Sequence, residues 1–218
     1  MDRQKRTQSS AIMLQLLKYF PGLTIPQLQQ FTNLEPLYAF WNDKINLISR
    51  ADVHNLAERH VLHSLSIAKV VGFRPGTRIL DLGTGGGFPG IPLAIMFPLV
   101  QFHMIDVVEK KTRAVFTIAN DLGLRNIRVE KLDGRNLNEQ YDYIVSRAVT
   151  DARTIYDWTH GFIGTDSRND LPNGILLLKG GELDKGLGDL DVVHYKFPIS
   201  NFFKQVYYDD KYVLYISV

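Results

Sequence analysis

The chain has 218 residues, of which 45% are hydrophobic, so it is long enough to bury one large core with a smaller appendage. Its formal net charge is +2, which excludes a strongly basic protein that coats nucleic acid but allows a local basic face. The sequence contains no cysteine, and this excludes disulfides, thiolate metal ligands and a cysteine nucleophile.

Residues 1–75 are predicted to form an N-terminal helical subdomain. Apolar residues recur every three or four positions along 28–48, as on one face of a helix. Because Pro36 lies inside this pattern, we expect two helices, the second beginning near Glu35. A further helix is expected over 52–71. No apolar run reaches the roughly 18 residues that a membrane span needs, and we expect a cytoplasmic protein.

From residue 77 onward, short apolar strands alternate with helices, which predicts a second domain over residues 76–218. The alternation is typical of an α/β protein with a doubly wound, mostly parallel sheet and helices on both faces. The last two of seven strands are expected to form an antiparallel hairpin, and residues 164–174 a surface loop. The predicted strands are 78–82, 101–105, 127–131, 141–146, 175–179, 192–197 and 212–218, and the predicted helices are 90–97, 109–121 and 150–163.

The first predicted strand runs into a glycine-rich turn. Gly83, Gly85 and Gly87 allow positive φ angles and a close approach of the backbone to a ligand. Pro89 is favourable as the first residue of the helix that follows. Free N–H groups and the positive end of that helix then face the space above the sheet edge. The turn therefore predicts a nucleotide-binding pocket.

Two nucleotide cofactors fit this turn. Residues 85–90 match the G-x-G-x-x-G pattern of dinucleotide-binding proteins, in which the pyrophosphate lies on the helix N-terminus. Asp81, Gly83, Gly85 and Gly87 instead match the acidic-x-G-x-G-x-G pattern of S-adenosylmethionine (AdoMet) methyltransferases. The second pattern also accounts for the acid, because AdoMet carries a cationic amino-acid part and no phosphate. We favour AdoMet and keep an NAD-dependent oxidoreductase as the alternative.

The ends of the second and third strands supply further candidate cofactor contacts. Asp106 follows Gly87 by 19 residues, where an acid accepts hydrogen bonds from ribose hydroxyls. The alternative for Asp106 is an ordinary N-cap of the next helix. The third strand leads to Gly134 and Arg135, which are expected to flank the adenine ring. A plain loop is the alternative there.

The fourth and fifth predicted strands end in the cations Arg147 and Lys179, our candidate catalytic residues. Arg147 has five donors and suits a carboxylate, a phosphate or the O6/N7 edge of a purine. Lys179 could reach a phosphate or the target base from the same edge of the sheet. The alternatives are a surface salt bridge for Arg147 and a snorkelling side chain for Lys179. The Asn/Asp-Pro-Pro-aromatic cluster of amino-group methyltransferases is missing after the fourth strand.

Residues 107–135 contain seven basic and four acidic side chains, an excess that could form a phosphate-contacting rim. Lys110 and Arg113 are the candidates for RNA contact in this rim, and a solvated helix face is the alternative. His60 and His63 are too few ligands for a metal site, so we expect no metal.

Taken together, these features resemble the bacterial small-subunit (16S) ribosomal RNA guanine-N7 methyltransferases, the glucose-inhibited division protein B family. The resemblance covers most of the chain, and its continuation after the glycines and its Ser-Arg-Ala motif are the most specific parts. The motifs are Trp41-Asn42-x-x-x-Asn46-Leu47, Arg59-His60, Asp81 to Leu93, Ile105-Asp106, Lys110 to Phe116, Ser146-Arg147-Ala148 and Leu178-Lys179-Gly180.

The resemblance implies a class I, Rossmann-like AdoMet methyltransferase fold and methyl transfer to guanine N7 in 16S rRNA, free or within the 30S particle. The sequence does not determine the oligomeric state, and a monomer is the default expectation. It implies cofactor contacts from Gly83, Phe88, Arg147 and a pair of residues after the third strand. That pair is Gly134-Arg135 in an ungapped comparison and Asn136-Leu137 if Arg135 matches an arginine often found just before the pair.

The same resemblance makes Arg50, Arg59 and His60 candidates for RNA binding. The chain departs from the family at His63, where an Asp is usual, and at the loop 164–173, which looks like an insertion. A non-catalytic RNA-binding module with a cofactor-shaped pocket is a further alternative.

The expected methyl transfer needs neither the cysteine nucleophile nor the Asn/Asp-Pro-Pro-aromatic cluster that the sequence lacks. Guanine N7 has an in-plane lone pair and no proton to lose, so it can attack the methyl group directly, without a general base or covalent nucleophile. Catalysis would then depend on holding N7 in line with the methyl, an effect worth up to about 7–11 kcal/mol in favourable systems. Arg147 and Lys179 are expected to orient the base and anchor phosphate.

Overall fold

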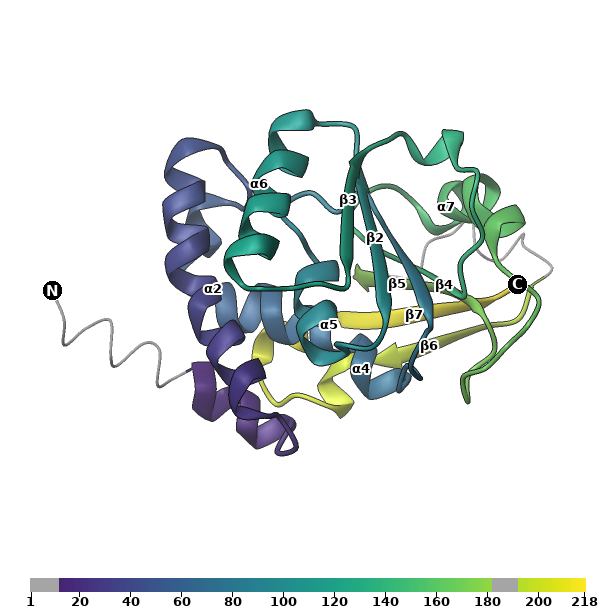
Figure 1. The fold of residues 1–218 in the computed structure, drawn as a ribbon. Coiled ribbons are helices and arrows are strands. Elements are labelled where there is room, and N and C mark those ends of the chain that lie inside the picture. The colour runs from purple at the N-terminus through teal and green to yellow at the C-terminus, as the bar shows by residue number, and fades with distance from the viewer. Residues whose placement is uncertain (1–11, 182–191) are drawn as a thin grey trace, which may run out of the picture.

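A sheet of seven strands lies at the centre of the computed structural model, which describes residues 12–181 and 192–218 (Figure 1). Its strand order is β3-β2-β1-β4-β5-β7-β6. Strands β1 to β5 are parallel, and β7 runs antiparallel to both of its neighbours. The predicted sheet and its terminal hairpin are confirmed. The strands are β1 Arg78–Leu82, β2 Gln101–Asp106, β3 Ile127–Lys131, β4 Tyr143–Arg147, β5 Gly174–Gly180, β6 His194–Pro198 and β7 Lys211–Ser217.

Helices cover both faces of the sheet. Helices α2, α5 and α6 and the helical segment 50–70 pack on one face, and α7 packs on the other (Figure 1). The α-helices are α2 Ile25–Lys44, α3 His63–Leu65, α4 Ile67–Val70, α5 Gly90–Met96, α6 Glu109–Asp121 and α7 Ala152–Thr159. A π-helical turn spans Leu56–Leu62, and the 3-10 turns are Arg50–Asn55, Gly134–Asn136, His160–Phe162, Ile199–Asn201 and Val206–Tyr208.

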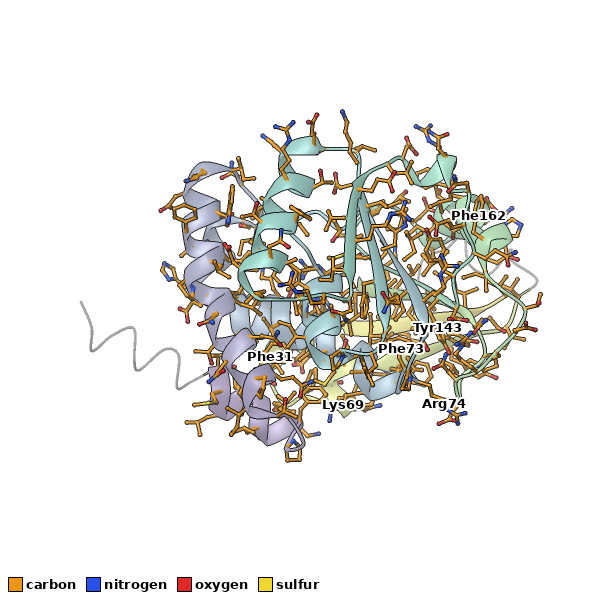
Figure 2. All side chains as sticks on the ribbon, in the orientation of Figure 1. Phe31, Lys69, Phe73, Arg74, Tyr143 and Phe162 are labelled. Atoms are coloured by element: carbon orange, nitrogen blue, oxygen red, sulfur yellow. The ribbon has the colours of Figure 1, made fainter. Side chains whose placement is uncertain are left out.

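The N-terminal helices share one hydrophobic core with the first face of the sheet. Phe31 of α2 is fully buried in this core, and the ring of Phe73 packs edge-on against Tyr143 of β4 at 5.0 Å between centroids (Figure 2). The division of the chain at residues 75 and 76 therefore remains a prediction, because the two parts are continuous in their packing.

Helix α2 continues through Pro36, so the predicted break near Glu35 is wrong. A proline inside a helix costs about 3 kcal/mol, since it removes a hydrogen bond and its ring meets the preceding turn. Phe31, Leu34 and Tyr38 are all fully buried around it. Burying such side chains stabilises by about 1.5–3 kcal/mol each, which outweighs the local penalty.

The helix predicted over 52–71 is instead a succession of 3-10, π and short α turns from Arg50 to Val70. Leu56, Val61 and Leu65 of this segment are buried, and Val53 and Ala68 are half-buried. The apolar spacing therefore predicts that this segment is helical, but it does not predict the changes between 3-10, π and α turns.

Smaller differences concern the ends of elements. Pro89 is the N-cap of α5 rather than its first residue, and the Phe88–Pro89 peptide bond is cis. The fourth strand begins at Tyr143 because Tyr141 pairs in an isolated bridge with Ile163. None of the helices in the described ranges is long and apolar enough to cross a membrane.

Candidate active site

The strand order reverses between β1 and β4, and ligands of such sheets bind beyond the carboxyl ends of the strands at this point. The glycine-rich turn begins here, and Gly83, Gly85 and Gly87 have φ angles of 66°, 56° and 91°. A Cβ at Gly83 would also lie less than 3.0 Å from the side chain of Val149, in the loop after β4. The turn is therefore shaped for glycine by conformation and by close packing.

Helix α2 packs against the glycine-rich turn and donates a hydrogen bond to it. The Tyr38 hydroxyl donates a 2.5 Å hydrogen bond to the carbonyl of Gly86, and burial raises the pKa of Tyr38, so it stays a donor. A Cβ at Gly86 would lie 2.7 Å from the carbonyl oxygen of Leu47. Asn42 accepts a 3.0 Å hydrogen bond from the N–H of Ile48 and so fixes the segment that carries Leu47. The Trp-Asn-x-x-x-Asn-Leu motif thus supports the turn.

Asp81 lies beneath the turn and is fully buried. Its Oδ2 accepts hydrogen bonds from the N–H of Gly90 at 2.9 Å and from the hydroxyl of Thr84 at 2.7 Å. Burial raises the pKa of Asp81 to about 7 against the lowering effect of these donors. The carboxylate therefore ties the end of β1 to the start of α5.

Asp106 reaches the turn from the end of β2. Its Oδ2 accepts a 2.9 Å hydrogen bond from the N–H of Gly85, and its Oδ1 accepts one of 2.8 Å from the N–H of Val108. The N-cap position of α6 is Val108, so Asp106 does not occupy it. Its carboxylate borders the glycine turn, where a ribose contact remains our prediction.

The segment after β3 divides into one buried glycine and two exposed side chains. Gly134 is buried, and a Cβ there would lie less than 3.0 Å from the side chain of Leu82 at the end of β1. Arg135 and Asn136 are exposed, and Arg135 Nε donates a 2.9 Å hydrogen bond to Asp133. Close packing beside β1 thus explains Gly134, and which pair flanks an adenine ring stays open.

Arg147 joins the turn to the helical segment. Its guanidinium lies over the Phe88 ring at 5.1 Å from the centroid, and it donates to the carbonyl of Arg59 at 3.3 Å. Its Nη2 lies 3.0 Å from Nδ1 of His60. Among the described residues no carboxylate lies within 4.0 Å of this guanidinium. Burial lowers the pKa of Arg147, but a guanidinium stays protonated, so the site holds a cation without a paired acid.

His60 and His63 lie behind Arg147 and are 8% and 5% exposed, so little water reaches either ring. Burial, assisted by the charge of Arg147, lowers the pKa of each to about 3, so both are neutral at physiological pH. The ring of His63 packs edge-on against Tyr207 at 5.9 Å between centroids. His63 therefore adds no charge to the site.

A pocket of about 560 Å³ opens between the ends of β4 and β5 and the helical segment, and Arg59, His60, Arg147 and Lys179 line it together. Lys179 Nζ donates a 2.6 Å hydrogen bond to the carbonyl of Thr150, in the loop after β4. The structure thus brings together both predicted catalytic residues and two of the predicted RNA-binding residues.

The pocket also contains residues that sequence reasoning missed. Tyr207 and Lys211 come from the last part of the chain and line the same pocket. Lys211 lies 5.0 Å and Arg59 5.3 Å from the centroid of the Tyr207 ring. No local motif marks Tyr207 or Lys211, because only the return of β7 beside β5 brings them to this edge.

The predicted basic rim is not part of the pocket. Lys110 and Arg113 are exposed on α6, and Arg113 pairs with Glu109 of the same helix. Three other rim cations, Arg128, Lys131 and Arg135, also pair with acids. The side chain of Arg50 lies outside what the structure describes. Within the described ranges no group of three or more ligating side chains could hold a metal ion.

Comparisons with known proteins agree on one family. The family model described as rRNA small subunit methyltransferase G matches residues 25–187. A protein named ribosomal RNA small subunit methyltransferase G from Cytophaga hutchinsonii is 46% identical over 199 residues, covering 91% of this chain and 96% of its own length. One of the same name from Christiangramia forsetii is 47% identical over 203 residues, covering 93% and 96%.

Solved structures support the fold. A SAM-dependent methyltransferase from Aquifex aeolicus superposes with a TM-score of 0.55 at 16% identity, covering 78% of this chain and 98% of its own. An MtNAS variant in complex with S-adenosylmethionine gives 0.56 at 13% identity, covering 84% and 72%. At such low identity these neighbours bear on the fold alone, and they confirm the predicted class I architecture.

Proposed function

The chain belongs to the rRNA small subunit methyltransferase G family, and on that premise we propose that it transfers a methyl group from AdoMet to N7 of a guanine in small-subunit (16S) ribosomal RNA. The main support is the contact between Phe88 of the glycine turn and Arg147 at the end of β4, at 5.1 Å. A cofactor on the turn and a base beside Arg147 would therefore be neighbours.

The residues of the turn fit AdoMet. Cβ atoms at Gly83, Gly86 and Gly87 would each lie less than 3.0 Å from another atom of the protein, so the packing around the turn requires glycine at these positions and keeps the turn tight. Asp106 at the rim of the turn suits the ribose hydroxyls. When bound, AdoMet supplies a methyl group activated by the positive sulfur.

A dinucleotide fits less well. In that alternative the pyrophosphate would lie on the N-terminus of α5, at Gly90. The N–H of Gly90 already donates to the buried carboxylate of Asp81 at 2.9 Å. A second anion at this place would be repelled by Asp81 and would find the amide occupied.

The reaction needs no general base in this site. The guanine N7 lone pair forms the new bond to the methyl carbon while the carbon–sulfur bond breaks, and the purine gains the positive charge. No proton leaves N7, so the neutral His60 and His63 have none to accept. The contribution of the chain is to place the base, an effect worth up to about 7–11 kcal/mol where the geometry is good.

Arg147 and Lys179 have separate tasks in this proposal. Arg147 offers its remaining donors to the purine edge or to a phosphate, and no nearby acid competes within the described residues. Lys179 holds the loop after β4 through Thr150, and that loop carries Val149 over Gly83. Lys179 is therefore a positioning residue as well as a candidate phosphate contact. Arg59 and Lys211, which pair with Asp52 and Asp210, and the ring of Tyr207 form the face of the pocket that we assign to the RNA strand.

The proposal is tested with 30S subunits and naked 16S rRNA from cells that lack the enzyme. We expect labelled methyl from AdoMet to enter RNA as 7-methylguanosine, and calorimetry to detect binding of AdoMet but not of NAD. The double variant Arg147→Met/Lys179→Met should lose most of the rate, while the exposed Arg153→Met should keep it. An unchanged rate in the double variant would refute the roles of Arg147 and Lys179, and label in another nucleoside would refute the proposed reaction.

A further inference from the structure

One ring nitrogen of His60 is buried without a protein partner. The side chain is 8% exposed, and its Nε2 has no hydrogen-bond partner among the described residues. A buried polar atom left unpaired costs free energy, so such atoms call for an explanation in a native structure. His60 also lines the pocket beside Arg147, but Nε2 itself exposes less than 1 Å², so a ligand could supply the missing partner only after a side chain of the pocket wall moves aside.

The contact with Arg147 fixes which nitrogen carries the proton. Nη2 of Arg147 lies 3.0 Å from Nδ1 of His60. A guanidinium can only donate, so Nδ1 must accept, and in a neutral imidazole the proton is then on Nε2. His60 therefore presents a fixed N–H donor with no acceptor in the described part of the chain.

The ring also lies next to the cofactor turn. Its centroid is 5.0 Å from that of Phe88, the residue that Arg147 covers at 5.1 Å. A base whose N7 reaches a methyl group held above this turn brings its neighbouring edge atom close to Arg147 and His60. In guanine that atom is O6, an acceptor, whereas adenine has the N6 amino group, a donor.

We propose that Nε2–H of His60 donates a hydrogen bond to O6 of the target guanine and so selects guanine over adenine. The assignment rests on the proposed N7 methylation. A donor at O6 leaves the N7 lone pair free to attack, and an adenine amino group would meet the N–H of His60 with a second donor.

The neutrality of His60 suits this task better than a second cation would. The purine becomes positively charged as the methyl group is transferred, and a cation beside O6 opposes that change. Burial and the charge of Arg147 lower the pKa of His60 to about 3, so it remains neutral through the reaction.

The test compares His60→Asn with His60→Gln. In His60→Asn the amide oxygen can take the place of the histidine Nδ1 and accept from Arg147, but no atom takes the place of Nε2. In His60→Gln the amide nitrogen can take the place of Nε2 and donate. The substrates are 16S rRNAs assembled with either guanine or 2-aminopurine at the methylated position. 2-Aminopurine keeps N7 but has hydrogen in place of O6.

With the wild-type protein we expect guanine to react about 10-fold faster than 2-aminopurine. His60→Asn should lower the rate on guanine and reduce the ratio of the two rates several-fold below that of the wild-type protein, while its Kd for AdoMet stays within about 2-fold of wild type. His60→Gln should recover part of the ratio. Comparing the ratio of the wild-type protein with that of the variant cancels the intrinsic difference between the two bases, as in a double-mutant cycle.

An unchanged ratio in His60→Asn would overturn the assignment. So would a loss of AdoMet affinity that matches the loss of rate, since His60 would then serve the cofactor. If His60→Asn does not fold, the wild-type rates still test the assignment, because equal rates on guanine and 2-aminopurine would contradict any donor at O6. A wild-type enzyme that leaves guanine N7 unmethylated would instead reject the proposed function itself.

Discussion

The Tyr38 hydroxyl, in the middle of α2, donates a hydrogen bond of 2.5 Å to the carbonyl oxygen of Gly86 in the glycine turn. The Tyr38 ring also packs against Phe88 at 4.8 Å between centroids. The two hydrogen-bonded residues are 48 positions apart in the sequence. The helix that precedes the sheet is therefore built into the wall of the candidate cofactor site.

Replacing Tyr38 with Phe should weaken AdoMet binding as well as the fold. The ring would still pack on Phe88, but the buried carbonyl of Gly86 would lose its donor, which costs about 1–3 kcal/mol. We expect a lower melting temperature and a several-fold higher Kd for AdoMet by calorimetry. Tyr143→Phe is the matched control, because its hydroxyl donates to the carbonyl of Leu171, away from the turn. An equal effect of both variants on AdoMet affinity would contradict a local role for Tyr38.

Replacing Gly83 with Ala should abolish most AdoMet binding. The new Cβ would lie less than 3.0 Å from Val149, and a φ of 66° is unfavourable for alanine by about 1–2 kcal/mol. The double variant Gly83→Ala/Val149→Ala removes the clash but keeps the backbone strain, so it should recover affinity only in part. Full recovery would mean that φ at Gly83 is irrelevant. No loss in the single variant would show that the turn is not the cofactor site.

The sequence was sufficient for the parts of the site that depend on strand order. The carboxyl ends of parallel strands share one edge of a sheet, so the turn after β1, Asp106 and Arg147 had to lie near one another once the strands were recognised. Local patterns could not reveal Tyr207 or Lys211, whose place depends on the pairing of β7 with β5. Contacts of that kind are set by tertiary packing alone.

Tyr38 was recognisable only in part. Its spacing marked it as an inward residue of a helix, and a buried tyrosine usually finds a hydrogen-bond partner. Its partner could not be named because the docking of α2 was unknown. The same docking explains why the predicted break at Pro36 is wrong. Helix α2 stays continuous because its apolar side chains are buried in the main core, and the helix sequence alone does not show this burial.

The basic rim, which stays a prediction, shows a different limit of sequence reasoning. An excess of basic residues along 107–135 suggested a cationic surface, but three acids of the same segment, together with Glu139, pair with four of its seven cations. Arg128 pairs with Glu130 and with Glu139, and Lys131 lies 3.4 Å from Glu109. A count of charges gives the net charge of a segment but does not show which of its cations are paired.

Asp106 should prove essential for cofactor affinity. In Asp106→Ala the N–H groups of Gly85 and Val108 lose their shared acceptor, and hydrogen bonds to a charged group contribute about 1.5–3 kcal/mol each. We expect the Kd for AdoMet and for S-adenosylhomocysteine to rise by about 10-fold or more, with Asp106→Asn intermediate. Asp157→Ala, which removes an exposed carboxylate on α7, should leave both values unchanged. Equal affinities for wild type and Asp106→Ala would rule out the ribose contact.

The stability of the fold should fall in mild acid. In the native state burial lowers the pKa of His60 and His63 to about 3, whereas an unfolded histidine has a pKa of about 6.5. The stabilising contribution of each neutral ring is therefore complete above pH 6.5 and is lost as the pH falls toward 3. Each histidine lowers the free energy of unfolding by about 1.4 kcal/mol for every unit by which the pH falls in this window.

Asp81 acts in the opposite direction. Burial raises its native pKa to about 7, so its contribution to stability is present at low pH and is lost as the pH rises from about 4 through 7. The raised pKa of Asp81 offsets the lowered pKa of one histidine, so these three groups together should decrease the free energy of unfolding by about 1.4 kcal/mol per unit as the pH falls from 6.5 to 5. Burial also lowers the pKa of His103, which adds a further decrease that the wild type and the variants share.

Urea unfolding at a series of pH values measures this slope. His63→Gln removes one buried titrating ring and should flatten the slope, because the remaining histidine and Asp81 then nearly cancel. Asp81→Asn should steepen it toward the sum of the two histidines. His160→Gln, which alters an exposed ring stacked on Tyr156, is the control and should match wild type. A wild-type stability that stays constant from pH 7 to 5, or an unaltered slope in His63→Gln, would mean that these rings titrate alike in the folded and unfolded chains. The assignment of the proton to Nε2 of His60 would then fail, because it assumes that the ring is neutral.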